Sequence, residues 1–152
     1  MKNLIAALAF LFVAAPLVAL DKPIAIFVTS DGAANGFTDP NKGNQDTMKD
    51  LRGSLKGRKS IALVDTREAA DIVLVVMSRE KAQITAGLLG DPARDVTVRI
   101  KFVYAGTETE MSASAQGGAM MSGGAWGRAA GKVAKQVEQW IETNRAKLTE
   151  VR

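Results

Sequence analysis

Two uninterrupted apolar runs place the strongest constraint on the fold of this chain. The runs PIAIFVTS (23–30) and DIVLVVMSR (71–79) lack the polar–apolar alternation of a strand that keeps one face in water. Strands that are apolar on both faces are typical of the middle of a covered sheet. We therefore expect both runs to form central strands, with SIALVD (60–65) as a shorter strand preceding the second run.

The segment DVTVRIKFVY (95–104) shows the opposite pattern, because its apolar residues alternate with polar ones. This alternation predicts a strand with one face toward the core. Ala105 and Gly106 then predict a two-residue turn, after which the chain returns antiparallel. This pairing places Lys101 directly opposite Glu110, and opposite charges facing each other across two strands favour the register.

Two helices are predicted from apolar residues at helical spacing. The first follows Thr47, which forms a capping-box pattern with Asp50, and it ends near Gly57. The second is long, because apolar residues from Trp126 to Leu148 recur on one face. The order of elements predicts an α+β domain, a two-layer sandwich. We expect a mixed sheet of about five strands, a right-handed β-α-β start, a hairpin, a long C-terminal helix, and both helices on one face.

The first twenty residues have the pattern of a secretory signal. MKN gives a positive start, LIAALAFLFVAA an apolar core, and PLVAL an exit with Ala19 before the expected cut. An uncleaved membrane anchor is the alternative, because Leu4–Leu20 approaches the roughly 18–20 apolar residues that span a bilayer. Pro16 and the short apolar core favour cleavage. We therefore expect a signal peptide over 1–20 and one exported domain over 21–152, periplasmic or extracellular, without an integral membrane segment.

The sequence contains no histidine and no cysteine. This excludes Ser-His-Asp and Cys-His catalysis, histidine-based zinc sites, disulfides and a lipid anchor on cysteine. After the expected signal the chain has 19 basic and 16 acidic residues, a mild surplus spread along the sequence. A nucleic-acid-binding protein would carry a clustered stripe instead. We therefore expect a non-enzymatic protein with no cofactor, no resident metal and no nucleic-acid partner.

The connection between the first strand and the first helix, SDGAANGFTDPNKGNQDT (30–47), is far longer than the usual connection of about 2–6 residues. It leaves the carboxyl end of a central strand, the usual ligand side of an open α/β sheet. Asp31, Asn35 and Asp39 supply oxygens that suit calcium, but the helix–loop–helix calcium template fails in both possible frames. Asx and Gly residues are also ordinary turn formers. Phe37 is either an anchor onto the core, which we favour, or a contact for a partner.

Two further connections are apolar where polar residues are expected. They are AGLLG (86–90), which contains Leu88 and Leu89, and GAMMSGG (118–124), which contains Met120 and Met121. Exposed Leu and Met side chains mark adaptable contact surfaces. Folding of these loops back onto the core is an equal alternative.

Three stretches resemble a group of small, uncharacterised exported bacterial proteins: GFTDPNKGNQDTMKDLRGSL, IALVDTREAADIVLVVMSRE and AWGRAAGKVAKQVEQWIETNR. In architecture, Ile61–Met77 is similar to periplasmic domains of curli-secretion channels and of activators of penicillin-binding proteins. That resemblance implies a domain that docks onto envelope proteins and does no chemistry. This chain departs from it in lacking a lipidated cysteine and an identifiable membrane-inserting hairpin.

The leading functional hypothesis is therefore an exported, non-catalytic domain that binds an envelope protein partner, alone or as a small homo-oligomer. Its expected docking surface combines the 31–46 loop with 86–90 and 118–124. The alternative is a small-ligand or cation-binding protein that uses the 31–46 loop. A carboxylate-dependent hydrolase is the third hypothesis, and it needs paired acids in a pocket.

Overall fold

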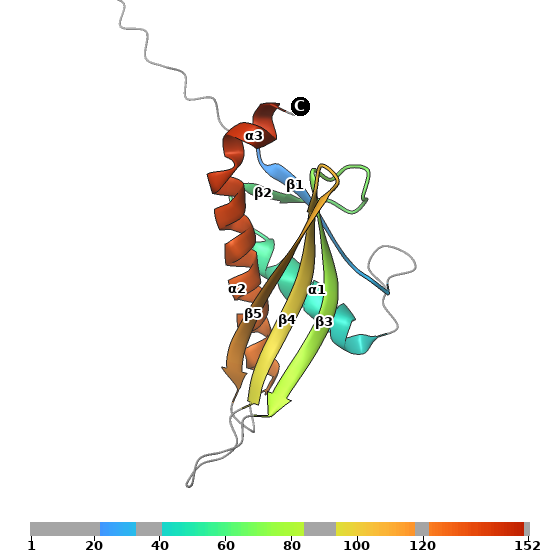
Figure 1. The fold of residues 1–152 in the computed structure, drawn as a ribbon, viewed down its shortest axis with the longest axis vertical. Coiled ribbons are helices and arrows are strands. Elements are labelled where there is room, and N and C mark those ends of the chain that lie inside the picture. The colour runs from blue at the N-terminus through green and yellow to red at the C-terminus, as the bar shows by residue number, and fades with distance from the viewer. Residues whose placement is uncertain (1–21, 33–40, 84–93, 118–121, 151–152) are drawn as a thin grey trace, which may run out of the picture.

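A computed structural model describes residues 22–32, 41–83, 94–117 and 122–150 (Figure 1). These residues form β1 (Ile24–Ser30), α1 (Lys42–Leu55), β2 (Ile61–Leu63), β3 (Ile72–Gln83), β4 (Arg94–Tyr104), β5 (Thr107–Gly117), α2 (Ser122–Thr143) and α3 (Arg145–Glu150). The strands form one sheet in the order β2-β1-β3-β4-β5. β1 pairs parallel with β2 and β3, whereas β3-β4 and β4-β5 are antiparallel. This is the α+β architecture that the sequence predicted.

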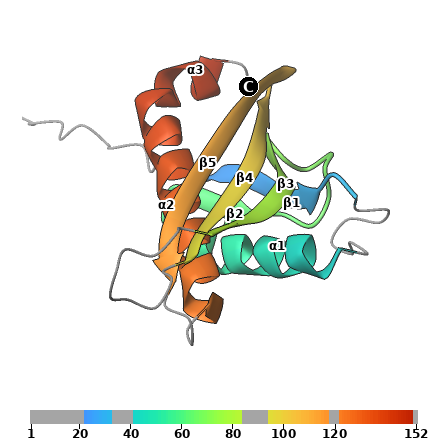
Figure 2. The ribbon, with the colours of Figure 1, turned by 60° about the horizontal axis from the view of Figure 1, so that its bottom comes forward.

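α1 and α2 both lie on one face of the sheet (Figures 1 and 2). Between the helices and the sheet is a core of alternate strand residues, which include Ile26, Val28, Ile72, Leu74, Val98, Ile100 and Phe102. The helices contribute Met48, Leu51, Leu55, Val133, Val137 and Ile141. The helices also contact each other directly, because a Cβ on Gly131 would lie 3.9 Å from the Ser54 hydroxyl. This distance is an ordinary van der Waals separation, so α2 packs beside α1 at this point.

The hairpin register is confirmed, because Lys101 is the partner of Glu110 across β4 and β5. The ion pair of Lys101 forms diagonally instead, with its Nζ 2.9 Å from a carboxylate oxygen of Glu108. Ala105 and Gly106 have φ values of 47° and 78°. Positive φ at both central residues is the condition for a type I′ turn, whose twist matches that of the two strands.

The first helix begins earlier than the sequence predicted. α1 starts at Lys42, and its N-cap is Asn41, whose Oδ1 accepts hydrogen bonds from the backbone N–H groups of Gly43 (2.9 Å) and Asn44 (3.4 Å). Thr47 lies inside the helix, where its hydroxyl donates to the Gly43 carbonyl (2.9 Å). Both residues are good caps, but starting at Asn41 adds a turn that buries Asn44 and Thr47 against the protein.

The C-terminal helix is interrupted. α2 begins at Ser122, ahead of the expected start at Trp126, and ends at Thr143. The Asn144 side chain donates to the Trp140 carbonyl (2.9 Å), which ends α2 before α3 begins. No helix among the described residues is long and apolar enough to cross a membrane. The expected signal segment, 1–20, lies outside the described residues.

The long edge strand β5 is covered along half of its length by side chains of α2. Three carbonyls accept hydrogen bonds there: Gln116 from Arg128 (2.6 Å), Ser114 from Lys132 (2.8 Å) and Ser112 from Gln136 (3.2 Å). Donors four residues apart on a helix advance about 6 Å, and acceptors two apart on a strand about 6.8 Å, so the two series stay in step. The contacts occupy edge groups that would otherwise be open to another strand.

Candidate functional site

Of the eight residues predicted as contacts, Asp31 alone falls among the described residues. Its backbone N–H donates to the Val76 carbonyl (3.1 Å), just beyond the end of β1, and its side chain is exposed. The pKa of Lys101 is raised, chiefly by its hydrogen bond to Glu108 and the charge of that carboxylate, with smaller contributions from Asp31 and Glu110. The other seven lie outside the described residues: Asn35, Phe37, Asp39, Leu88, Leu89, Met120 and Met121.

The chain on either side of the predicted contact segments nevertheless converges on one part of the molecule. Gln83 pairs with Arg94, and Arg94 pairs with Gly117, so β3, β4 and β5 stop side by side at the lower end of the sheet in Figure 1. The 84–93 and 118–121 segments both leave from this end. The first turn of α1, which follows the 33–40 segment, contacts Arg79 of β3.

A bulge in β3 places Arg79 on the helix side of the sheet. Val76 pairs with Ile100, whereas Ser78 pairs with Arg99, so Met77 is an extra residue in the ladder. Up to the bulge the even-numbered residues of β3 face the core, and beyond it the odd-numbered ones do, because side chains alternate along a strand. Arg79 therefore points toward the helices, opposite Val98.

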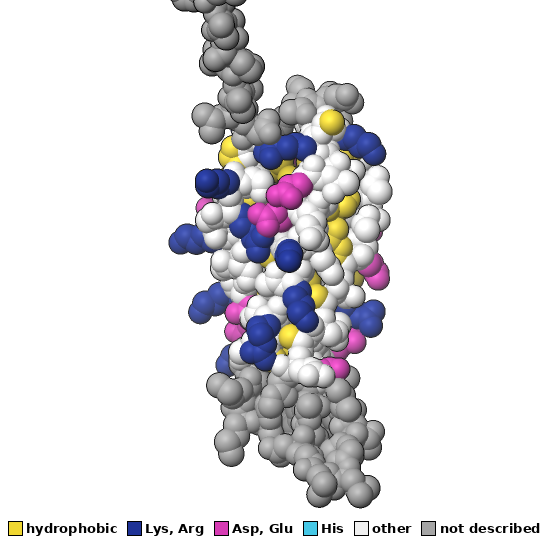
Figure 3. Space-filling model, turned by 90° about the vertical axis from the view of Figure 1, so that its left-hand side faces the viewer, with side chains coloured by type: hydrophobic (Ala, Val, Ile, Leu, Met, Phe, Trp, Pro, Cys, Tyr) yellow, Lys and Arg dark blue, Asp and Glu magenta, His cyan; other side chains and the backbone are white. Residues whose placement is uncertain are grey.

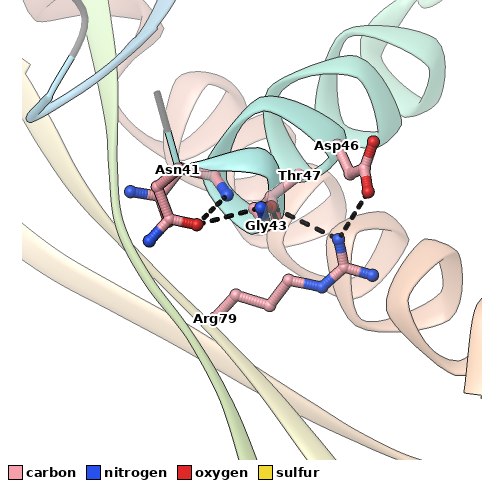
Figure 4. Close-up of polar contacts among 6 residues, drawn as sticks. Asn41, Gly43, Asp46, Thr47 and Arg79 are labelled. Atoms are coloured by element: carbon pink, nitrogen blue, oxygen red, sulfur yellow. Dashed lines mark hydrogen bonds and ion pairs between the residues drawn. The ribbon is translucent and has the colours of Figure 1, made fainter. Parts of the chain in front are cut away.

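Arg79 contacts two helices at this point, and Figure 4 shows its contacts with α1. Its guanidinium donates to the carbonyl of Gly43 at 3.3 Å and lies 3.5 Å from a carboxylate oxygen of Asp46, both in α1. Its Cζ also stacks 4.0 Å from the centroid of the Trp126 ring in α2. The Arg79 side chain is only 16% exposed. β3, α1 and α2 are therefore held together by one nearly buried cation.

The electrostatics of the first α1 turns follow from this cation and from burial. Partial burial raises the pKa of Asp50, and the positive charge of Arg79 opposes that rise. Asp46 raises the Asp50 pKa further, because the two carboxylates repel each other. Arg79 thus favours the ionised form of Asp50, although burial has the larger effect on the pKa of this carboxyl.

A hollow of about 580 Å³ opens beside Arg79. Its walls include Asn41, Asn44, Met77 and Trp126, and its cations are Lys42, Arg79 and Lys81. The volume falls in the range of about 300–1,000 Å³ that is usual for small-molecule sites. The lining also includes Asp46, which pairs with Arg79, so Lys42 and Lys81 are the cations that remain to attract an anionic or polar group. Within the described ranges, no three His, Cys, Asp or Glu residues lie close enough to hold a metal ion.

Comparison with solved structures finds similar chains at low identity. PelC from Paraburkholderia phytofirmans, solved as a dodecamer, is 14% identical, with a TM-score of 0.48 over 73% of this chain and 84% of its own. Lipoprotein GNA1162 from Neisseria meningitidis is 15% identical, with a TM-score of 0.41 over 77% of this chain and 99% of its own. The sequence matches no protein-family model and no curated protein. The likeness concerns the fold alone.

Sequence reasoning did not find the junction around Arg79. The sequence showed an arginine at the polar end of an apolar run and a tryptophan near the start of an amphipathic helix. Nothing in DIVLVVMSR signals the extra residue Met77, which sets the side of the sheet to which Arg79 points. Asn41 could have signalled the start of α1, and so the helix turn that Arg79 contacts, because asparagine is a preferred N-cap.

Proposed function

We propose that this protein is an exported, non-catalytic domain that binds a protein partner in the cell envelope. In this proposal residues 1–20 are removed near Ala19, and the single domain 21–152 acts in the periplasm or outside the cell. The docking surface is the end of the domain around Arg79, which we call the loop end. We define it by the described residues Asn41–Asp46, Met77–Lys81 and Trp126.

One observation carries this proposal. Described residues in or near the three predicted contact segments, Asn41, Lys81 and Trp126, line one hollow beside Arg79, although Asn41 and Trp126 are 85 positions apart in sequence. The junction is built to hold its shape, since Arg79 is held by α1 and α2 together. A rigid base beneath several loops is the usual arrangement of a recognition surface. The absence of histidine and cysteine from the whole sequence supports a non-catalytic role.

Site-specific photocrosslinking in the bacterium that makes the protein tests the proposal. A crosslinking residue is placed at Lys42 or Lys81, which are exposed at the loop end, and at Glu108 as a control near the opposite hairpin turn. We expect one common protein adduct from the two loop-end positions and none from Glu108. Identical adducts from all three positions, or none from any of them, would remove the proposed docking surface.

Export and cleavage are tested on the same cells. N-terminal sequencing of the protein recovered from the periplasm or medium should place the first residue near Leu20. Full-length protein that stays in the membrane fraction would instead support the anchor alternative.

A second candidate function is the binding of a small anionic ligand, and the hollow beside Arg79 favours it. Three cations and two asparagines line this hollow. The cation-binding version of this hypothesis relied on Asp31, Asn35 and Asp39, of which only Asp31 is described. Calorimetry with inorganic phosphate, citrate and calcium separates the two versions. Heat from the anions that disappears in Lys42→Gln/Lys81→Gln would support the anion site, whereas heat from calcium alone would support the cation version.

A further inference from the structure

In the folded protein, the surplus of basic residues lies on the helical side of the sheet. α1 with the turn after it (42–59) and α2 with α3 (122–150) contain eleven Lys or Arg and five Asp or Glu. The rest of the chain contains nine basic and eleven acidic residues. Since both helices lie on one face of the sheet, the mild surplus along the sequence becomes a basic helical layer with a surplus of six.

The free cations of this layer point away from the core. Lys42, Lys49 and Lys56 recur every seven residues, which places them along one side of α1, and all three are exposed. Lys135 is exposed on α2. No ion pair among the described residues involves any of these four lysines, although acids of the same layer are paired with Arg79 and Arg58. Figure 3 looks onto the α2 side and shows Lys and Arg from one end to the other, with fewer acids between them.

We propose that the helical layer is an interaction surface for an anionic lipid membrane. Its cations are spread over two helices rather than gathered in a groove, which matches a broad, diffuse sheet of negative headgroups. Four to eight basic residues that face a membrane are the usual content of such a surface. The layer shares the first residues of α1 and Trp126 with the loop end, but Lys49, Lys56 and Lys135 lie outside the loop end, so this inference does not rest on the proposed protein partner.

The size of the effect follows from electrostatics. Each basic residue near an anionic membrane surface strengthens binding by about fivefold at moderate salt. The attraction extends over about 10 Å at 0.1 M salt and only about 3 Å at 1 M. Binding should therefore need anionic lipid and vanish in 1 M salt. Binding should also depend on the positions of the cations, because the net charge of the chain alone should not be sufficient for binding.

Vesicle co-sedimentation of the purified protein, in the processed form that the cells accumulate, tests this inference. The probes are vesicles of phosphatidylcholine alone, which is neutral overall, and of phosphatidylcholine mixed with the anionic lipid phosphatidylglycerol. The test variant is Lys49→Gln/Lys56→Gln/Lys135→Gln. The matched control is Lys22→Gln/Arg67→Gln/Arg99→Gln, which removes the same charge from exposed positions outside the helical layer. Thermal melts of both variants check the fold.

We expect the wild type to bind the anionic vesicles at 0.1 M salt and to dissociate at 1 M. The test variant should bind about 100-fold more weakly, since three contributions of about fivefold are lost, and the control should stay within about threefold of wild type. Equal losses in the two variants would mean that net charge alone acts, and the inference would fail. Equal binding to neutral vesicles, or no binding by the wild type, would also overturn it.

Discussion

The guanidinium carbon of Arg79 lies 4.0 Å from the centroid of the Trp126 ring, and this stacking joins β3 to the beginning of α2. Trp126 is only 4% exposed, so the contact is largely out of water. A desolvated cation–π pair contributes more than an exposed one, up to about 2 kcal/mol. The same guanidinium reaches Gly43 and Asp46, so the position of α1 depends on it as well.

A double-mutant cycle measures the Arg79–Trp126 contact. Arg79→Met keeps most of the apolar stem and removes the charge, and Trp126→Leu removes the ring face. We expect urea unfolding to give a coupling free energy of about 1–2 kcal/mol between the two changes. A parallel cycle of Lys135→Met with Trp126→Leu is the control, because the exposed Lys135 has no contact with the ring in the described structure. Additive effects of Arg79→Met and Trp126→Leu would show that the stacking contributes nothing.

The contacts between α2 and the edge of β5 predict a change in association. The variant Arg128→Ala/Lys132→Ala/Gln136→Ala removes all three donors and leaves the carbonyls of Ser112, Ser114 and Gln116 open to another strand. We expect sedimentation velocity to show a larger, concentration-dependent mass than for wild type. Lys135→Ala/Gln139→Ala, on exposed positions of the same helix, should leave the mass unchanged. An unchanged mass in the triple variant would mean that other features protect this edge.

The hairpin turn predicts a stabilising substitution. Ala105 has a φ of 47°, where a Cβ is strained, whereas glycine adopts this conformation without steric strain. Ala105→Gly should therefore raise the free energy of unfolding by about 0.5–1 kcal/mol. The same change at Ala146, in α3, should lower it by up to about 1 kcal/mol, because glycine is a poor helix former. Loss of stability in both variants, measured by thermal or urea unfolding, would contradict the type I′ assignment.

The raised pKa of Asp50 predicts that the stability of the folded protein depends on pH. Burial raises its pKa in the folded protein above the ordinary value of 3.8, so the folded state binds the proton more tightly than the unfolded chain does. The favourable contribution of the neutral form is fully present below pH 3.8 and is lost as the pH rises through the folded pKa. Asp50→Asn should therefore be more stable than wild type at pH 7, by about 0.5 kcal/mol or less for a partly exposed group.

The stability difference between Asp50→Asn and wild type should shrink toward zero as the pH falls below 3.8. Thermal melts of the two proteins across this range measure it, with Glu142→Gln, an exposed carboxylate of α2, as the control. A variant that is less stable than wild type at pH 7 would mean that attraction between Asp50 and Arg79 outweighs the cost of burial.

The local patterns in the sequence were sufficient for the elements and their layers. Apolar runs over 23–30 and 71–79 specified central strands, because continuous apolar runs are typical of strands in the middle of a sheet, although here both helices cover the same face. The alternation over 95–104 and the Ala105-Gly106 turn specified the hairpin and its register, since a slip by one residue would turn every apolar side chain to the solvent. The boundaries were less certain, because Asn41 and Thr47 are both competent caps and only burial of the first turn selects Asn41.

The candidate site and the charge distribution were decided by the tertiary structure. An extra residue at Met77 turns Arg79 toward α1 and α2, and a bulge leaves no periodic signal in an already continuous apolar run. The basic surplus seemed uniform along the chain because sequence order does not show which elements share a layer. Packing of α1 and α2 on one face brings their cations together, and this depends on contacts between segments that are far apart in sequence.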